Sequence, residues 1–290
     1  MIAKRRYKTR RSVFIVGLVV AFLMILASCT TPTAQNGAST ATESALTQVA
    51  DEGNLKVGYL VFPPAITKDP SSGELGGHLV TAIEEIARLN DWTIEFIETD
   101  WAAFSTGLDS QRFDISIVPT FITIPRALSV YFTDPLFYAG NSAISRTEET
   151  RFTDLESIDQ PGVKVAVTQG EAGDEYASAN FTNAEIVRFS GSDQSLTFQS
   201  VVSGRADIAL GDAYVTSEFA EENPQVKDLF ADNPYNLTPV SWGVRKGDDE
   251  MLNFANSSLQ VFEQQGKLQE WEREAGANWL HVKQVLELTR

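Results

Sequence analysis

The 290-residue sequence has one cysteine, two histidines and few basic residues. One cysteine excludes an intramolecular disulfide and a thiolate metal cluster, and two histidines leave little for a zinc or iron site. The 23 basic residues are outnumbered by 39 acidic ones, so the formal net charge is −16. Nucleic-acid binding needs clustered lysine and arginine to neutralise phosphates. We therefore expect no nucleic-acid partner, no metal and no cofactor.

The first 29 residues have the pattern of an export signal. Six basic residues between positions 4 and 11 precede an uncharged run over residues 13–26, which is shorter than the roughly 20 residues that span a bilayer. The run ends in Leu26-Ala27-Ser28-Cys29, which resembles the lipobox of bacterial lipoproteins. This resemblance implies a signal peptide over residues 1–28, a lipid anchor in the bilayer through Cys29 and an extracytoplasmic location. The alternative is a chance cysteine after an uncleaved anchor helix.

The segment after Cys29 is poor in large apolar side chains. Residues 30–44 consist mainly of threonine, alanine, serine and glycine, and such a segment buries too little surface to order itself. We expect a flexible linker that, together with the lipidated cysteine, covers residues 29–50.

The remaining chain is expected to fold, because 43% of all residues are hydrophobic. Strands are expected over residues 55–61, 93–98, 115–118, 164–167, 185–188 and 207–210, and helices over residues 79–89, 102–110, 172–180, 192–203, 249–265 and 267–275. This alternation favours βαβ units and mainly parallel sheets, arranged as two α/β units in tandem. Residues 138–145 and 233–242 are the expected crossings between them.

Several segments, in a fixed order, resemble one family. Residues 123–136 read TIPRALSVYFTDPL, and this is similar to the T-P-x-R-A…F-S-x-P-Y pattern of the extracellular solute-binding proteins of polar amino-acid ABC importers. Further similar segments are residues 55–64, Trp101, Leu108, Phe113 and Asp114, residues 204–207 with Asp212, and residues 242–248 with Gly266 and Trp271. Together they cover nearly all of residues 53–276.

The resemblance implies an α/β chain with the type II periplasmic-binding-protein fold. Each lobe would be a mainly parallel sheet flanked by helices, and two hinge strands would join the lobes. Residues 51–141 and 239–290 would form lobe 1, and residues 142–238 would form lobe 2. The implied function is that of a monomeric substrate-binding protein. It would capture a small solute, an amino acid or a related amine, between the lobes and deliver it to an ABC permease.

Four residues are expected to contact such a ligand. Arg126 would hold a carboxylate through a bidentate pair, and the alternative is a solvated arginine after a proline turn. The resemblance makes Asp212 the partner of the ligand's ammonium group, and Asp212 is also a candidate N-cap for a helix over residues 213–223. Phe62 and Trp101 would flank the apolar part of the ligand. The alternative for both aromatic residues is an ordinary place in the core.

Three further expected site residues depart from the family's pattern. Phe121 stands where the family commonly has serine or threonine, so only its backbone N–H can donate. Glu171 and Ala172 stand where the family has a Gly-Thr or Gly-Ser carboxylate cradle, which leaves the N–H of Ala172 available. Glu171 is either a solvent-facing acid at a helix N-terminus or a cleft acid that selects a cationic group.

The same fold also includes enzymes. The resemblance extends to cyclohexadienyl and arogenate dehydratases, in which a glutamate of the second-lobe helix acts as general acid. Asp174 and Glu175 lie near that position, but the pattern Gly-Gly-Thr-Asn-Glu is absent, and we expect two solvated acids. The sequence therefore predicts a binding protein without enzymatic activity. A lyase and a ligand-sensing receptor subunit are the alternatives.

Overall fold

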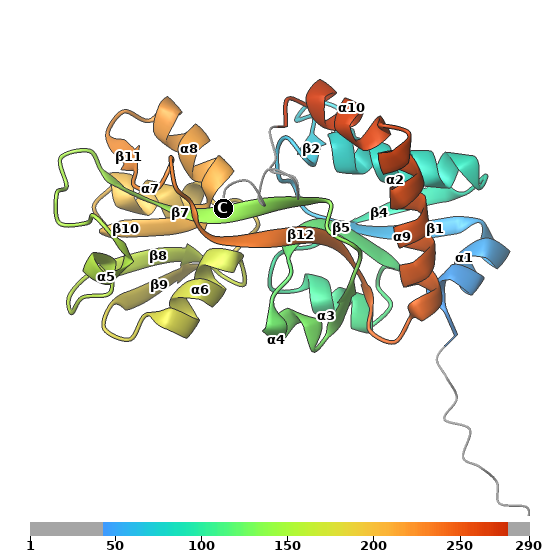
Figure 1. Cartoon of the computed structure of the whole chain (residues 1–290), viewed down its shortest axis with the longest axis horizontal. Coiled ribbons are helices and arrows are strands. Elements are labelled where there is room, and N and C mark those ends of the chain that lie inside the picture. The colour runs from blue at the N-terminus through green and yellow to red at the C-terminus, as the bar shows by residue number, and fades with distance from the viewer. Residues whose placement is uncertain (1–42, 278–290) are drawn as a thin grey trace, which may run out of the picture. The chain divides into compact units, whose positions relative to one another are not determined.

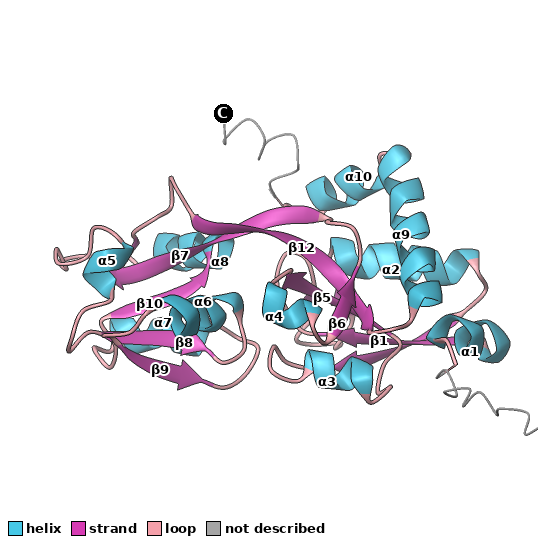
Figure 2. Ribbon diagram, turned by 60° about the horizontal axis from the view of Figure 1, so that its bottom comes forward, coloured by secondary structure: helices cyan, strands magenta, loops and turns pink. Residues whose placement is uncertain are grey.

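A computed structural model of the chain describes residues 43–277 (Figures 1 and 2). The expected signal peptide, the lipidated Cys29, most of the expected linker and residues 278–290 of expected lobe 1 lie outside the described residues. Within the described range, no helix combines the length and the apolar character that crossing a membrane requires.

The described chain alternates helices and strands. The helices are α1 (Ala45–Glu52), α2 (His78–Leu89), α3 (Phe104–Asp109), α4 (Ile124–Ala127), α5 (Leu155–Ile158), α6 (Ala172–Asn180), α7 (Ser195–Val202), α8 (Ala213–Glu222), α9 (Asp249–Gln264) and α10 (Lys267–Glu274). The strands are β1 (Asn54–Tyr59), β2 (Thr67–Lys68), β3 (Leu75–Gly76), β4 (Thr93–Glu98), β5 (Ile115–Phe121), β6 (Val130–Phe132), β7 (Phe137–Arg146), β8 (Lys164–Thr168), β9 (Glu185–Phe189), β10 (Ile208–Asp212), β11 (Val226–Asp228) and β12 (Tyr235–Arg245).

The main sheet has ten strands and contains two parallel groups. Its order is β4-β1-β5-β12-β7-β10-β8-β9, with β6 paired to β12 and β11 paired to β7. Strand β1 is parallel to β4 and β5, and β8 is parallel to β9 and β10. The antiparallel strands β12 and β7 lie between these groups and pair with each other. The sheet therefore consists of two similar units in tandem, as the sequence predicted.

Strands β7 and β12 run side by side from one lobe into the other (Figure 1). They contain most of the two segments expected as crossings, residues 138–145 and 233–242. The predicted two-lobed α/β fold with two connecting strands is confirmed. The residue limits of the two lobes stay a prediction.

Alternating side chains give lobe 2 a core on both faces of its sheet. Val165, Val167, Ile208 and Leu210 belong to one buried cluster, which also includes Ala177 of α6 and Phe181 after it. Their strand neighbours Ala166 and Ala209 belong to a second cluster, together with Phe198 and Val201 of α7. Successive residues of a strand point to opposite faces. Helices α6 and α7 therefore cover opposite faces of this sheet.

The core of lobe 1 is a single larger cluster around β5. Every residue of β5 is buried, as expected for a central strand between two helical layers. Helix α2 buries Leu79, Ile83 and Ile86 in this cluster, and α9 adds Met251 and Phe262. The 3.6-residue period of the apolar positions explains why these helices lie on the sheet.

The first helix corrects the expected linker. Residues 45–50 were assigned to the linker, but they belong to α1, whose Ala45 and Val49 are buried. Ser44 caps the helix and donates from Oγ to Asp248 Oδ1 over 2.7 Å, and the Ala45 N–H donates to Asp248 Oδ2 over 2.7 Å. Burial of these two side chains and hydrogen bonds to a distant carboxylate thus order a segment that the polar composition of residues 30–44 had led us to assign to the linker.

We predict that Asp248→Ala lowers the free energy of unfolding by about 2–4 kcal/mol, because several hydrogen bonds to one buried carboxylate are lost and their donors are left unpaired. Asp248 also accepts from the Met251 N–H and from Arg245 Nη2. Urea unfolding measures the loss. The neighbouring Asp249 is exposed, so Asp249→Ala is the matched control, with an expected change below about 0.5 kcal/mol. Equal effects of the two substitutions would contradict this account of α1.

Candidate functional site

Eleven residues from both lobes line one small cavity. They are Phe62, Trp101, Pro119, Phe121, Arg126, Phe137, Ala139, Glu171, Ala172, Asp212 and Val240. All seven residues that the sequence analysis expected at a ligand site are among them. The cavity has a volume of about 10 Å³, room for roughly one water molecule. The sequence analysis missed Pro119, Phe137, Ala139 and Val240, because these strand residues have the pattern of ordinary core.

Phe62 and Trp101 form one wall of the cavity. Both are buried, and their ring centroids lie 5.9 Å apart with an interplanar angle of 89°, an edge-to-face arrangement that aromatic pairs favour. Trp101 Nε1 is buried without a hydrogen-bond acceptor in the described part of the chain. This indole N–H is a donor that a ligand could use.

Arg126 enters the cavity from the short helix α4, and it is only 7% exposed. Nη1 donates to the Phe121 carbonyl over 3.0 Å and Nη2 to the Gly170 carbonyl over 2.7 Å. Nε lies 2.7 Å from Glu175 Oε1. Burial lowers the pKa of Arg126, and the charges of Glu175 and Glu171 oppose this effect. The alternative expectation, that Arg126 is a solvated surface residue, is therefore wrong.

Phe121 acts here through its carbonyl oxygen, which Arg126 occupies, and its side chain is buried in the cavity wall. Gly170 brings the second carbonyl to Arg126. Its φ of +78° is a left-handed conformation that favours glycine, and a Cβ at this position would lie 3.0 Å from the backbone Cα and N of Ala102. Glycine therefore permits the loop of lobe 2 to approach lobe 1 this closely.

Glu171 and Asp212 are the two buried carboxyl groups of the cavity, each 2% exposed. Glu171 caps α6 by accepting from the Gly173 N–H over 2.8 Å, and Asp212 caps α8 by accepting from the Tyr214 N–H over 2.9 Å. Burial raises the pKa of Glu171 to about 8 and that of Asp212 to about 7, although backbone hydrogen bonds oppose both shifts. Both side chains are thus structural caps that also line the cavity.

The burial of Glu171 decides between its two expected orientations. The solvent-facing orientation is wrong, since the carboxyl group lines the cavity. The N–H of Ala172, which we expected to be available to a ligand, lies beside the Glu171 carboxyl group and lowers its pKa. The position that the family resemblance associated with a carboxylate cradle holds a carboxyl group of the protein here.

The expectation that Asp174 and Glu175 are two solvated acids is also wrong. Asp174 is buried, accepts from the Gly170 N–H and pairs with Arg188 Nε at 2.9 Å. The Glu175 side chain is 31% exposed, and its Oε1 pairs with Arg126. Its Oε2 is buried and lacks a hydrogen-bond partner among residues 43–277. Glu175 is a functional candidate that the sequence analysis placed in solvent, because a first-turn acid looks the same in sequence whether it faces water or a cleft.

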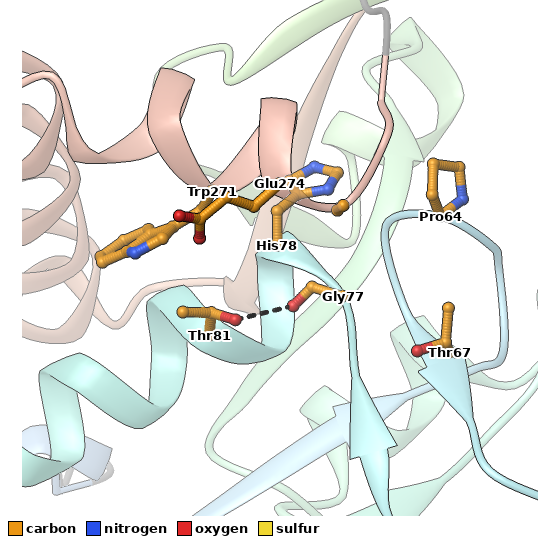
Figure 3. A pocket seen from close by; sticks show the side chains of 8 residues that line it. Pro64, Thr67, Gly77, His78, Thr81, Trp271 and Glu274 are labelled. Atoms are coloured by element: carbon orange, nitrogen blue, oxygen red, sulfur yellow. Dashed lines mark hydrogen bonds between the residues drawn. The ribbon is translucent and has the colours of Figure 1, made fainter.

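Two other features add no second site. Across residues 43–277, no group of three or more histidine, cysteine, aspartate or glutamate side chains could hold a metal ion. A hollow of about 320 Å³ lies beside α2 and α10 and is lined by residues such as His78, Thr81 and Trp271 (Figure 3). It belongs to lobe 1 alone and contains none of the expected site residues, so we assign no function to it.

Comparison with known proteins agrees with the fold. The sequence profile of the bacterial extracellular solute-binding proteins, family 3, matches residues 55–276. The chain belongs to this family. The expected resemblance is confirmed at the level of the family.

Individual relatives of this family 3 protein include both binding proteins and an enzyme. It is 26% identical to cyclohexadienyl dehydratase of Pseudomonas aeruginosa over 244 residues, which covers 84% of this chain and 88% of the relative. It is 26% identical to a probable amino-acid ABC transporter-binding protein of Haemophilus influenzae over 199 residues, or 69% and 75% of the two chains. The crystal structure of an ancestral amino acid-binding protein, a precursor of cyclohexadienyl dehydratase, superposes with a TM-score of 0.71 and 28% identity over 80% of this chain and 99% of the other.

We predict that Glu171→Gln stabilises the protein at high pH. The pKa of Glu171 rises from 4.5 to about 8 on folding, so the folded state holds an extra proton between these values and loses stability as the pH rises through them. Glutamine can still accept the hydrogen bond that caps α6, and because it does not ionise, it does not lose stability as the pH rises. Thermal unfolding should give a Tm roughly 10 °C above wild type at pH 9 and about equal to wild type at pH 5.

The exposed Glu156 of the same lobe provides a control, since Glu156→Gln should leave the difference between the two pH values unchanged. A Glu171→Gln protein whose Tm follows that of the wild type at both pH values would show that Glu171 is not buried in solution.

Proposed function

We propose that this chain is the substrate-binding protein of an ABC importer, held outside the cytoplasm by a lipid on Cys29. It captures a small solute, an amino acid or a related amine, between its lobes and delivers it to a membrane permease. The observation that carries the proposal is the convergence of seven residues, expected from separate parts of the sequence, on one cavity between the lobes. The family match and the name of the Haemophilus influenzae relative support the class of function.

Binding and lobe closure are coupled in this mechanism. Arg126, Phe62 and Trp101 come from lobe 1, and Glu171 and Asp212 come from lobe 2. A ligand that contacts both groups has a higher affinity for the closed arrangement, and this difference drives closure. The cavity holds about 10 Å³, so the lobes must separate to admit a solute larger than water. The two connecting strands β7 and β12 are the natural hinge.

Within the cleft, Asp212 and Glu171 face the ligand's amine, and Phe62 and Trp101 exclude water around its body. Arg126 is the group that a ligand carboxylate would reach, but it already pairs with Glu175. A thermal-shift panel of amino acids and their decarboxylated amines tests the proposal, because a ligand at 100 times its Kd stabilises by about 2.7 kcal/mol. No shift with any of these compounds would refute it.

A second candidate function is a dehydratase, which the relative from Pseudomonas aeruginosa brings into consideration. Burial raises the pKa of Glu171 to about 8, so this group holds a proton at neutral pH. It could donate that proton to the leaving hydroxyl of prephenate, which departs as water while the ring carboxylate leaves as CO2 and its bonding electrons form the new ring π bond. Incubation with prephenate, followed by an assay for phenylpyruvate, tests this function. If the wild type forms phenylpyruvate and the Glu171→Gln variant does not, the result would favour a lyase over a receptor.

We predict that Asp212→Asn weakens the affinity for the ligand found in the panel roughly 10- to 100-fold. Asparagine caps a helix about as well as aspartate, so the change removes mainly the charge-assisted contact with the amine. Isothermal titration calorimetry measures the change. Asp154 caps α5 in the same way but is exposed, and Asp154→Asn should bind like the wild type. An Asp212→Asn protein within threefold of wild-type affinity would contradict the assigned role.

A further inference from the structure

The arginine of the cleft already has a carboxylate partner within the protein. Arg126 Nε pairs with Glu175 Oε1 at 2.7 Å, and carbonyl oxygens of Phe121 and Gly170 accept from its two other nitrogens. A guanidinium group has five N–H donors, so three of them are engaged. Glu175 does not line the cavity, but it already supplies Arg126 with the negative charge that the carboxylate of an amino-acid ligand would otherwise provide.

The charges around the cavity disfavour a further carboxylate. Arg126 is the sole basic residue in the cavity lining, whereas Glu171 and Asp212 line it and Glu175 contacts Arg126. The negative charge of Glu175 cancels much of the attraction that Arg126 would exert on a ligand anion a few ångströms away. An incoming carboxylate would be the third carboxyl group acting on one guanidinium, after Glu175 and Glu171.

The same cavity favours a cation. None of the ion pairs found among residues 43–277 involves Glu171 or Asp212. The partners of both are backbone N–H groups, and each carboxyl group lines the cavity. Phe62 and Trp101 complete the wall, and aromatic faces attract ammonium groups. The free indole N–H of Trp101 requires only a neutral acceptor, which adds no charge.

We propose that the cleft selects an organic amine cation that lacks a carboxylate, in preference to the amino acid with the same side chain. Glu171 and Asp212 bind the ammonium group, and Glu175, instead of a ligand carboxylate, compensates the charge of Arg126. This inference rests on the proposed function, since it names the class of solute that the same cleft carries. It differs from the amino-acid ligands that the names of several relatives state.

Matched pairs of ligands that differ only in the carboxylate test the inference. Isothermal titration calorimetry of the purified full chain compares agmatine with L-arginine, cadaverine with L-lysine and histamine with L-histidine. We expect at least one amine to bind at least tenfold more tightly than its amino acid. Tighter binding of the amino acid in every pair that binds would overturn the inference but leave the proposed function intact. The absence of binding by all six compounds would overturn both.

A substitution at Glu175 tests the reason for this selectivity. Glu175→Gln removes the internal carboxylate from Arg126, so the affinity for the amino acid of the pair should rise at least tenfold while that for the amine changes less than threefold. The exposed Glu185 of β9 provides the control, and Glu185→Gln should leave both affinities unchanged. An unchanged affinity ratio in Glu175→Gln would overturn the proposal. The ligand pairs on the unaltered protein decide the matter even if this variant folds poorly.

Discussion

The closed cleft depends on the burial of Arg126 between the two lobes. Removing a guanidinium group from water is unfavourable unless a counter-ion and hydrogen-bond acceptors replace the water. Two of its three partners, the Gly170 carbonyl and Glu175, belong to lobe 2, whereas Arg126 and Phe121 belong to lobe 1. The charge of Arg126 is therefore compensated only when the two lobes are in contact. The close approach of Gly170 to Ala102 is the steric condition for it.

The sheet topology explains why charged and capping groups meet at this place. In each lobe, neighbouring parallel strands end at the same edge, and ligand sites of α/β proteins lie outside such carboxyl ends. Strand β10 ends at Asp212, where α8 begins, and β8 ends at Thr168, shortly before the Glu171 cap of α6. In lobe 1, β5 ends at Phe121 just before the helix that carries Arg126. The two edges face each other because β7 and β12 join the lobes.

Local patterns in the sequence predicted most of this arrangement. The strand over residues 93–98 and the helix over residues 172–180 have the predicted bounds, because alternation of side chains and helix capping are local properties. Helix α1 was missed, because its order comes from Asp248, about 200 positions away in the chain. The family resemblance led to seven residues that line the cavity, but not to the partner of Arg126. Glu175 lies in the first turn of a helix, and the sequence around it does not show whether its side chain faces solvent or the cleft.

In the proposed binding mode, a proton and the ligand cation compete for the same two carboxyl groups. With the cleft closed, burial raises the pKa of Glu171 to about 8 and that of Asp212 to about 7, so protons neutralise much of their charge near neutral pH. A cation bound between them would favour the ionised forms and displace those protons into solvent. The site then remains close to neutral in either case, and this avoids an uncompensated buried charge. A carboxylate on the ligand weakens this exchange, because its negative charge favours retention of the protons that hold the acidic groups neutral.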